Sequence, residues 1–333
     1  MNIDELGEFG LIKRIAPWFP APPDCHQGIG DDCAVLPGRD DRLLLVTTDL
    51  LVENSHFLRD RIPPEDLGYK ALAVNVSDIA AMGGTPTSAF LSLGLPAGMN
   101  VAWLDRFFEG LRMMSAEVSC PLLGGDTTKS ASGIIINIAV LGEVEHDRIR
   151  YRSAARPGDV IAVTGSLGDS GAGLRLLLEN KPVDDVAVRA LIDAHHHPRP
   201  HVAEGRWLGA QTGVHAMMDV SDGIDSDVRR IMERSGVGAA IQLEALPVTE
   251  HFTAVCQRYA WPAAEIAATA GEDYCLLCTM DAAAFPAVAK EFQQRFHRPL
   301  APIGVIEAGS EFHYQLNGRP AQLRRRGFDH FKE

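Results

Sequence analysis

The sequence has few cysteines, few aromatic residues and no long hydrophobic run. Its 6 cysteines in 333 residues are too sparse for a disulfide-stapled fold. The longest apolar stretch, residues 134–141, is far too short to cross a bilayer and contains Asn137. The first five residues are acidic and lack the apolar segment of a signal peptide. These absences lead us to expect a cytoplasmic location.

Positive charge and the common nucleotide-binding motifs are also missing. Asp and Glu number 44 against 31 for Lys and Arg, which gives a net charge of −13. This charge disfavours nonspecific binding to nucleic acid or to anionic membranes. No G-x-x-x-x-G-K-[ST] loop occurs, and no G-x-G-x-x-G lies between a strand and a helix. An acidic chain without these loops needs another way to hold phosphate groups, and metal ions bound to carboxylates are the candidate.

The hydrophobic content of 46% is enough for sizeable cores, and the length of the chain favours two domains. The polar stretch 146–156 and the turn Pro157-Gly158-Asp159 suggest a boundary, which divides the chain into residues 1–148 and 149–333. Apolar periodicity predicts helices at 65–82, 101–118, 171–179, 185–195, 222–234 and 282–296, and strands at 43–46, 88–95, 134–141, 160–164, 240–243, 274–280 and 303–306. This alternation indicates an α/β or α+β protein.

Aspartates recur beside small residues, at positions that read as strand ends or helix starts. The groups are Gly28-Ile29-Gly30-Asp31-Asp32, Thr47-Thr48-Asp49, Ser77-Asp78, Gly124-Gly125-Asp126-Thr127-Thr128 and Asp219-Val220-Ser221-Asp222-Gly223. If these groups converge in space, their mutual repulsion requires a hard cation. Carboxylate oxygens suit Mg²⁺, which usually lies between a few carboxylates and substrate phosphates. The pattern therefore predicts metal-dependent phosphate chemistry.

Several other motifs have a structural as well as a functional interpretation. The glycine-rich segment 165–173 fits either an anion-binding loop or a helix entry capped by Asp169 or Ser170. The Cys275-Leu276-Leu277-Cys278 motif is more typical of a buried strand than of a redox or zinc site, because no second cysteine pair follows. The three histidines 195–197 favour a structural or solvated role, since consecutive helical residues point in different directions.

The ordered set of motifs resembles the thiamine-monophosphate kinase family, in the superfamily of aminoimidazole ribonucleotide synthetase and selenophosphate synthetase. The resemblance covers nearly the whole chain. It includes the aspartate groups above and also Gly7-Glu8-Phe9, His56-Phe57, Tyr69 to Asn75, Gly168-Asp169-Ser170, Gly271-Glu272-Asp273-Tyr274 and Gly327-Phe328-Asp329-His330-Phe331. It implies Mg²⁺- and ATP-dependent phosphorylation of thiamine monophosphate, two domains of α/β type, and a homodimer whose N-terminal sheets join in a barrel.

The resemblance also implies residue roles. The implied Mg²⁺ ligands are Asp32, Thr47, Thr48, Asp49, Asp78, Asp126, Asp219 and Asp222; the ATP contacts are Gly125, Asp126, Arg152 and Ser221; the thiamine monophosphate contacts are His56, Glu272 and Phe328. Three residues depart from the family pattern: Asn54 and Ala270 replace glycines, and Cys275 replaces a glutamate. The competing interpretations are another ATP-dependent synthetase of the superfamily and a nucleotide-binding regulatory paralogue. No residue is predicted to act as a covalent nucleophile.

Overall fold

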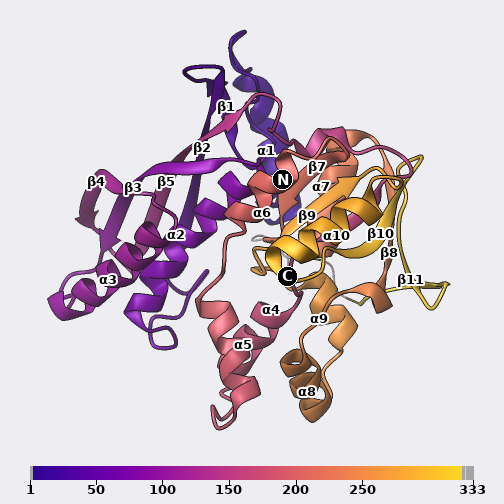
Figure 1. The fold of residues 1–333 in the computed structure, drawn as a ribbon. Helices are drawn as coiled ribbons and strands as arrows, with labels where there is room; N and C mark the ends of the chain where they lie inside the picture. Colours follow the sequence, from indigo (N-terminus) through magenta and orange to yellow (C-terminus); the bar gives the residue numbers. More distant parts are fainter. Residues whose placement is uncertain (1–2, 325–326, 328–333) are drawn as a thin grey trace.

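The computed structural model describes residues 3–324 and residue 327, in which two β-sheets are each packed against helices (Figure 1). The first half of the chain forms a five-stranded sheet with the strand order β1-β2-β5-β3-β4, in which only β3 and β4 are parallel. Its elements are α1 (Ile3–Ile15), η1 (Ala16–Trp18), β1 (Ala34–Pro37), β2 (Arg42–Val52), α2 (Pro64–Ala81), β3 (Thr85–Leu95), α3 (Val101–Glu117), β4 (Leu122–Lys129) and β5 (Ile135–Glu145).

One face of this first sheet is covered and the other is open to solvent. Helix α2 packs on β2 and β5, and α3 packs on α2. On the opposite face, which we call the outer face, the side chains of Leu50 and Phe90 are 50% and 40% exposed. Every residue of the edge strand β4 is exposed. Within the described residues the sheet is open, and the barrel that the family resemblance implies would need a second copy of the chain.

The second half forms a seven-stranded, mostly antiparallel sheet with the order β12-β11-β8-β10-β6-β9-β7. Its elements are η2 (Arg152–Ala154), β6 (Val160–Val163), α4 (Asp169–Leu178), α5 (Val186–His196), α6 (Val202–Gly209), β7 (Val214–Asp219), α7 (Ile224–Ser235), β8 (Gly238–Gln242), η3 (Leu243–Ala245), α8 (Glu250–Tyr259), α9 (Ala263–Thr269), β9 (Leu276–Met280), α10 (Phe285–Phe296), β10 (Ala301–Glu307), β11 (Phe312–Leu316) and β12 (Arg319–Ala321).

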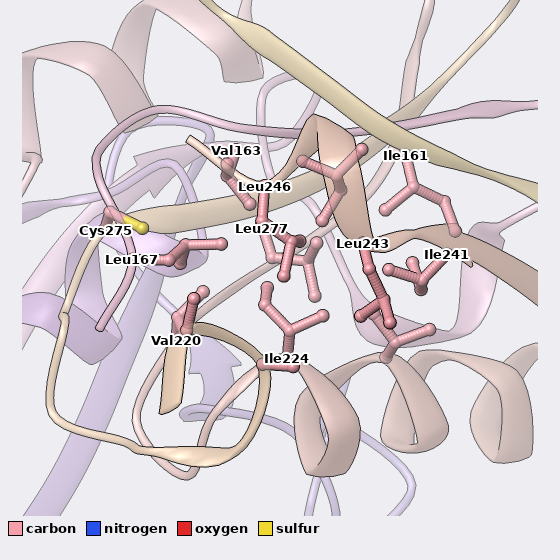
Figure 2. Packing of buried hydrophobic residues seen from close by; sticks show 14 of the residues in the cluster. Ile161, Val163, Leu167, Val220, Ile224, Ile241, Leu243, Leu246, Cys275 and Leu277 are labelled. Carbon is pink, nitrogen blue, oxygen red and sulfur yellow. The ribbon is translucent and has the colours of Figure 1, made fainter. Parts of the chain in front are cut away.

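Apolar side chains fill both faces of the second sheet. On one face Ile161, Val163 and Leu277 pack against residues of α4, α7 and α8 (Figure 2). On the other face residues of α6 and α10 pack with Met217 and with the end of α2. Cys278 is buried within β9, and Cys275 is buried just before it, as predicted for a structural strand. The mixed two-domain α/β architecture expected from the sequence is therefore confirmed.

Helix α2 joins the two halves through polar residues on one of its sides. Positions 66, 70 and 77 share this side because an α-helix repeats every 3.6 residues. Asp66 lies 3.0 Å from His197 Nε2, and Lys70 Nζ donates a hydrogen bond to the carbonyl of His195 at 3.1 Å. Ser77 Oγ donates to Asp219 Oδ2 at 2.6 Å. This polar side of α2 forms the seam between the two halves.

Two aspartate groups do not lie at strand ends as the sequence suggested. Thr47, Thr48 and Asp49 lie in the middle of β2, which runs on to Val52. Alternation along the strand therefore places Thr47 and Asp49 on the face toward α2, and Thr48 on the outer face. Gly125 and Asp126 lie inside the edge strand β4.

No described helix is both long enough and apolar enough to cross a membrane.

Candidate metal and substrate site

Three carboxylates from distant parts of the sequence converge at the seam. Asp32 lies in the loop before β1, Asp78 in the last turn of α2, and Asp219 at the end of β7. One carboxylate oxygen from each lies within 4.8 Å of the others. We call these residues the carboxylate cluster. The sequence predicted all three as metal ligands, and the fold brings them together.

Burial and mutual repulsion disfavour ionisation of Asp49, Asp78 and Asp219 when no cation is bound. Burial, followed by the charge of Asp32, raises the pKa of Asp219 to about 7. Burial and the charge of Asp49 raise the pKa of Asp78 well above its usual value. Burial and the charge of Asp222 raise the pKa of Asp49 to about 6. The site is therefore a region of concentrated negative potential in a partly dry environment.

The donor set fits a hard divalent cation. All the converging atoms are carboxylate oxygens, the ligand type that Mg²⁺ and Ca²⁺ prefer. Among the described residues, Asp219 Oδ1 is buried and has no hydrogen-bond partner, although such atoms are normally satisfied. Arg152 offsets part of the negative charge, because its guanidinium pairs with Asp32. A bound cation would satisfy the orphaned oxygen and relieve the repulsion.

Other predicted ligands surround the carboxylate cluster. Thr47 Oγ1 donates a hydrogen bond to Asp78 Oδ2 at 2.5 Å. The backbone N–H of Asp49 donates to Asn75 Oδ1 at 2.9 Å, which holds β2 against α2. Asp222, in the loop after β7, pairs with the guanidinium of Arg230. Thr47 and Asp49 therefore lie beside the carboxylate cluster, and the charge of Asp222 acts on Asp49.

Thr48, Gly125 and Asp126 are not brought to the carboxylate cluster. Thr48 Oγ1 accepts a hydrogen bond from Asn137 Nδ2 at 2.8 Å on the outer face. Asp126 is exposed and aligned through β3 and β5 with Leu50 of β2. Three strand spacings of about 4.8 Å place β4 about 14 Å from β2. Within one chain, these residues cannot share an ion with Asp78.

Of the two described residues of the predicted acceptor site, Glu272 lies next to the loop after β7. The backbone N–H of Glu272 donates to the carbonyl of Ser221, a predicted ATP contact, at 2.7 Å. His56 follows the end of β2, and the backbone of that strand holds its ring. The N–H of Val52 donates to His56 Nδ1 at 3.1 Å, so the proton of the neutral ring is on Nε2. Phe328, the third predicted contact, lies outside the described residues.

The departures from the family pattern have local explanations. Asn54 has a φ of 68°, a left-handed conformation that glycine adopts freely and that asparagine tolerates. Ala270 has φ −79° and ψ 137°, an ordinary extended conformation that does not require glycine. Cys275 packs in the apolar core beside Leu167, so a carboxylate at this position would be buried (Figure 2).

The glycine-rich segment 165–173 serves as a helix entry. Gly168 precedes α4 in the left-handed region, with a φ of 83°, and its N–H donates to Asp273 Oδ2 at 2.9 Å. The expected side-chain cap is absent at this described helix end. Asp169 instead accepts hydrogen bonds from Ser166 Oγ and Thr249 Oγ1. The loop thus supports residue 273, which follows Glu272.

Sequence reasoning missed three charged or titratable residues that line the site, namely Lys70, His195 and Arg230. Lys70 and His195 contact Glu272, and Arg230 contacts Asp222. One of these residues could have been found from the sequence, because Lys70 is the single lysine in the apolar helix predicted at 65–82. The described histidines 195–197 do not form a metal site, because they contact Glu272 and Asp66 separately.

We expect the metal-free protein to lose stability as the pH rises from about 4 to about 7. Asp49 and Asp219 have pKa values of about 6 and about 7 in the folded chain, above the value of about 3.9 in unfolded chains. The folded state therefore keeps protons that the unfolded state has released, so its stability falls across this interval. Thermal melting at stepped pH measures this loss.

Two controls separate the carboxylate cluster from other titrating groups. Added Mg²⁺ should flatten the pH dependence, since a bound cation favours the ionised carboxylates. Asp219→Asn should flatten it without Mg²⁺, because the variant lacks one of the groups with a raised pKa. A wild-type protein whose melting temperature rises across this interval without Mg²⁺ would contradict the prediction.

The fold and the sequence agree with proteins of one family. Residues 30–144 match the family model of the AIR synthase related protein N-terminal domain, and residues 156–317 match that of the C-terminal domain. A thiamine-monophosphate kinase of Aquifex aeolicus is 40% identical over 279 residues, covering 84% of this chain and 87% of the relative. The Escherichia coli (strain K12) thiamine-monophosphate kinase is 38% identical over 330 residues, covering 98% of each chain.

A solved structure of a related protein has the same fold as this chain. AaThiL complexed with AMPPCP and TMP matches with a TM-score of 0.87 and 36% sequence identity, and the match covers 99% of both chains. Both halves of the chain and their relative arrangement are therefore shared with that structure. The chain belongs to the thiamine-monophosphate kinase family, within the AIR synthase related proteins.

Proposed function

We propose that this protein transfers the γ-phosphoryl group of ATP to thiamine monophosphate, giving thiamine diphosphate and ADP. Its relative AaThiL was solved with AMPPCP, an ATP analogue, and with TMP. The observation that carries the proposal is the 2.7 Å backbone hydrogen bond between Glu272 and Ser221. This bond joins a predicted acceptor contact to the segment that bears Asp219 and Asp222. ATP and thiamine monophosphate could therefore bind next to each other beside the carboxylate cluster.

We propose Mg²⁺ as the cation of the carboxylate cluster, held by Asp32, Asp78 and Asp219, with Asp49, Asp222 and Thr47 beside it. When bound, Mg²⁺ neutralises phosphate oxygens and so lowers the repulsion between ATP and a phosphorylated acceptor. The protein residues position the two substrates and exclude water. We propose that Arg152, whose guanidinium pairs with Asp32, also contacts ATP.

We propose that Thr48, Gly125 and Asp126 serve the nucleotide and its metal at the outer face of the first sheet. The exposed apolar residues Leu50 and Phe90 share this face, and β4 is the edge strand of the sheet in the described part of the chain. A second copy of the chain would cover both features, which supports the homodimer that the family resemblance implies. We also place the domain boundary near residue 148, between the two sheets.

The proposed acceptor site consists of His56 and Glu272, with Phe328 as a further contact. The thiazolium ring of thiamine carries a fixed positive charge, so a carboxylate such as Glu272 is a suitable contact. The ring of Phe328 would stack on a heterocycle. The position of Glu272 beside the loop after β7 supports the first assignment.

Incubation with ATP, Mg²⁺ and thiamine monophosphate should yield thiamine diphosphate and ADP in equal amounts, without a phosphorylated protein. Direct transfer is expected because the described site contains carboxylates and cations rather than an activated nucleophile with its base. The measurement is product separation with γ-labelled ATP, followed by a search for label on the protein. ADP and free phosphate without thiamine diphosphate would refute the activity. A labelled protein that chases into product would refute direct transfer.

A further inference from the structure

A buried ion pair joins the two halves of the chain beside the proposed acceptor site. Lys70 of α2 is only 1% exposed, and its Nζ lies 2.8 Å from Glu272 Oε1. The same ammonium donates to the carbonyl of His195 at 3.1 Å. A buried ammonium is costly unless it is paired and hydrogen-bonded. Both contacts of Lys70 come from the second half of the chain, so the pair forms only when the halves are docked.

The rest of the environment fixes Glu272 from other sides. His195 Nδ1 lies 3.3 Å from Glu272 Oε2 and 3.0 Å from Ser170 Oγ. Burial, and then the charge of Lys70, lower the pKa of His195 to about 3, so this ring is neutral. It orients the carboxylate without cancelling its charge. The ammonium of Lys70 therefore balances the charge of Glu272.

The backbone around Glu272 is held in an unusual conformation. Glu272 and Tyr274 have φ values of 64° and 47°, in the left-handed region that non-glycine residues seldom adopt. Hydrogen bonds from Glu272 N–H to Ser221 and from Gly168 N–H to Asp273 hold this segment in place. The Glu272 side chain nevertheless remains 26% exposed. A carboxylate that is fixed on several sides and open on one is suited to hold a ligand.

We propose that Lys70 is a positioning residue for acceptor recognition. It holds one oxygen of Glu272 and keeps the carboxylate ionised and oriented, and the open side of the carboxylate binds the cationic heterocycle of the acceptor. Burial raises the pKa of Glu272, but the charge and the hydrogen bond of the neighbouring Lys70 ammonium act against burial, and the net pKa is lowered. This inference rests on the proposed function and assigns a role to a residue of the opposite half. Acceptor binding therefore requires that α2 and the Glu272 segment be docked.

The test is a double-mutant cycle on acceptor affinity. Lys70→Met and Glu272→Gln should each weaken binding of thiamine monophosphate about 10- to 100-fold, the range for a lost hydrogen bond to a charged group. Lys70→Met/Glu272→Gln should bind no more weakly than Glu272→Gln alone, because Lys70 acts through Glu272. Lys70→Arg keeps the charge and should retain most of the affinity. Calorimetric titration of thiamine monophosphate and, separately, of AMPPCP measures these effects.

A matched control breaks a neighbouring contact on the same side of α2. Asp66→Asn weakens the pairing with His196 and His197 one turn away, so it should lower the melting temperature and leave both ligand affinities unchanged. If Lys70→Met fails to fold, two other variants replace it. The double variant leaves no unpaired buried charge, and Lys70→Gln keeps a hydrogen-bond donor. Lys70→Gln should lose affinity for thiamine monophosphate and keep affinity for AMPPCP.

The outcomes distinguish this inference from the proposed function. Normal acceptor affinity in folded Lys70→Met or Lys70→Gln, additive losses in the cycle, or equal losses for both ligands would each overturn the positioning role alone. A wild-type protein that binds AMPPCP but not thiamine monophosphate would overturn the proposed function and, with it, this inference. Non-additive losses of affinity that affect thiamine monophosphate but not AMPPCP support both the positioning role and the proposed function.

Discussion

Asp78→Asn should reduce turnover by a factor on the order of a thousand while the protein stays folded. Removal of one group that stabilises charge in a transition state commonly has an effect of this size. Asp78 lies in the carboxylate cluster and accepts the hydrogen bond from Thr47. Asparagine has nearly the same shape, so the fold is kept, but it lacks the charge that holds a divalent cation. Steady-state kinetics across a range of Mg²⁺ concentrations measures the loss.

The same substitution should raise the melting temperature of the metal-free protein. Burial and the neighbouring Asp49 and Asp219 disfavour a charge at position 78, so its removal relieves repulsion. A gain in stability together with a loss of activity is typical of functional sites. Asp105→Asn, at an exposed position of α3, is the matched control and should change neither quantity. Turnover of Asp78→Asn near the wild-type value would remove this residue from the site.

Gly110→Ala should destabilise the protein by about 3 kcal/mol or more, at the upper end of the effects of overpacking. A Cβ at Gly110 would lie 1.7 Å from the carbonyl oxygen of Glu65, and one at Gly68 would lie 1.9 Å from that of Phe107. Two helix backbones meet at these glycines, so no rotamer change can relieve the clash. The helix α2, with Asp78 and Lys70, would have to move away from α3. Chemical denaturation and thermal melting measure the loss.

Gly124→Ala provides a comparison for the stability measurement. A Cβ there would meet only Phe90, at 3.7 Å, which is ordinary van der Waals contact. Gly124 also lies on the exposed strand β4, and its φ is not in the left-handed region. Its substitution should therefore leave the melting temperature within a few degrees of the wild type. Equal stability of Gly110→Ala and Gly124→Ala would contradict the close approach of α2 and α3.

Elements with strong apolar periodicity were predictable from the sequence. The predictions of 65–82 and 101–118 differ little from α2 (Pro64–Ala81) and α3 (Val101–Glu117). Elements with weak patterns escaped, such as β7 (Val214–Asp219) and the exposed β4 (Leu122–Lys129). Strand β4 contains two glycines and no apolar alternation, so a local pattern could not reveal it. Its place in the sheet depends on pairing with β3.

The candidate site was predictable as a set of residues but not as an arrangement. Asp32, Asp78 and Asp219 stand out because aspartates beside small residues are unusual next to apolar runs. The separation of Thr48 from Thr47 follows from strand alternation, and this could be derived only once β2 was known to continue through them. Lys70 was missed because a lysine in a helix normally points to solvent. Its partner Glu272 lies 202 positions later, and only the folded chain brings the two together.

Because Lys70 and Asp78 lie on one rigid helix, α2 fixes the distance between the proposed acceptor site and the proposed metal site. The two residues are separated by about 12 Å along the axis, at a rise of about 1.5 Å per residue. Insertion or deletion of one residue between them would turn Lys70 by about 100° away from Glu272 and shift the spacing between acceptor and metal. Length variation should therefore be tolerated in the surface loops but not in this segment. The same fixed spacing would limit the acceptors to molecules whose charged ring and phosphate are as far apart as those of thiamine monophosphate.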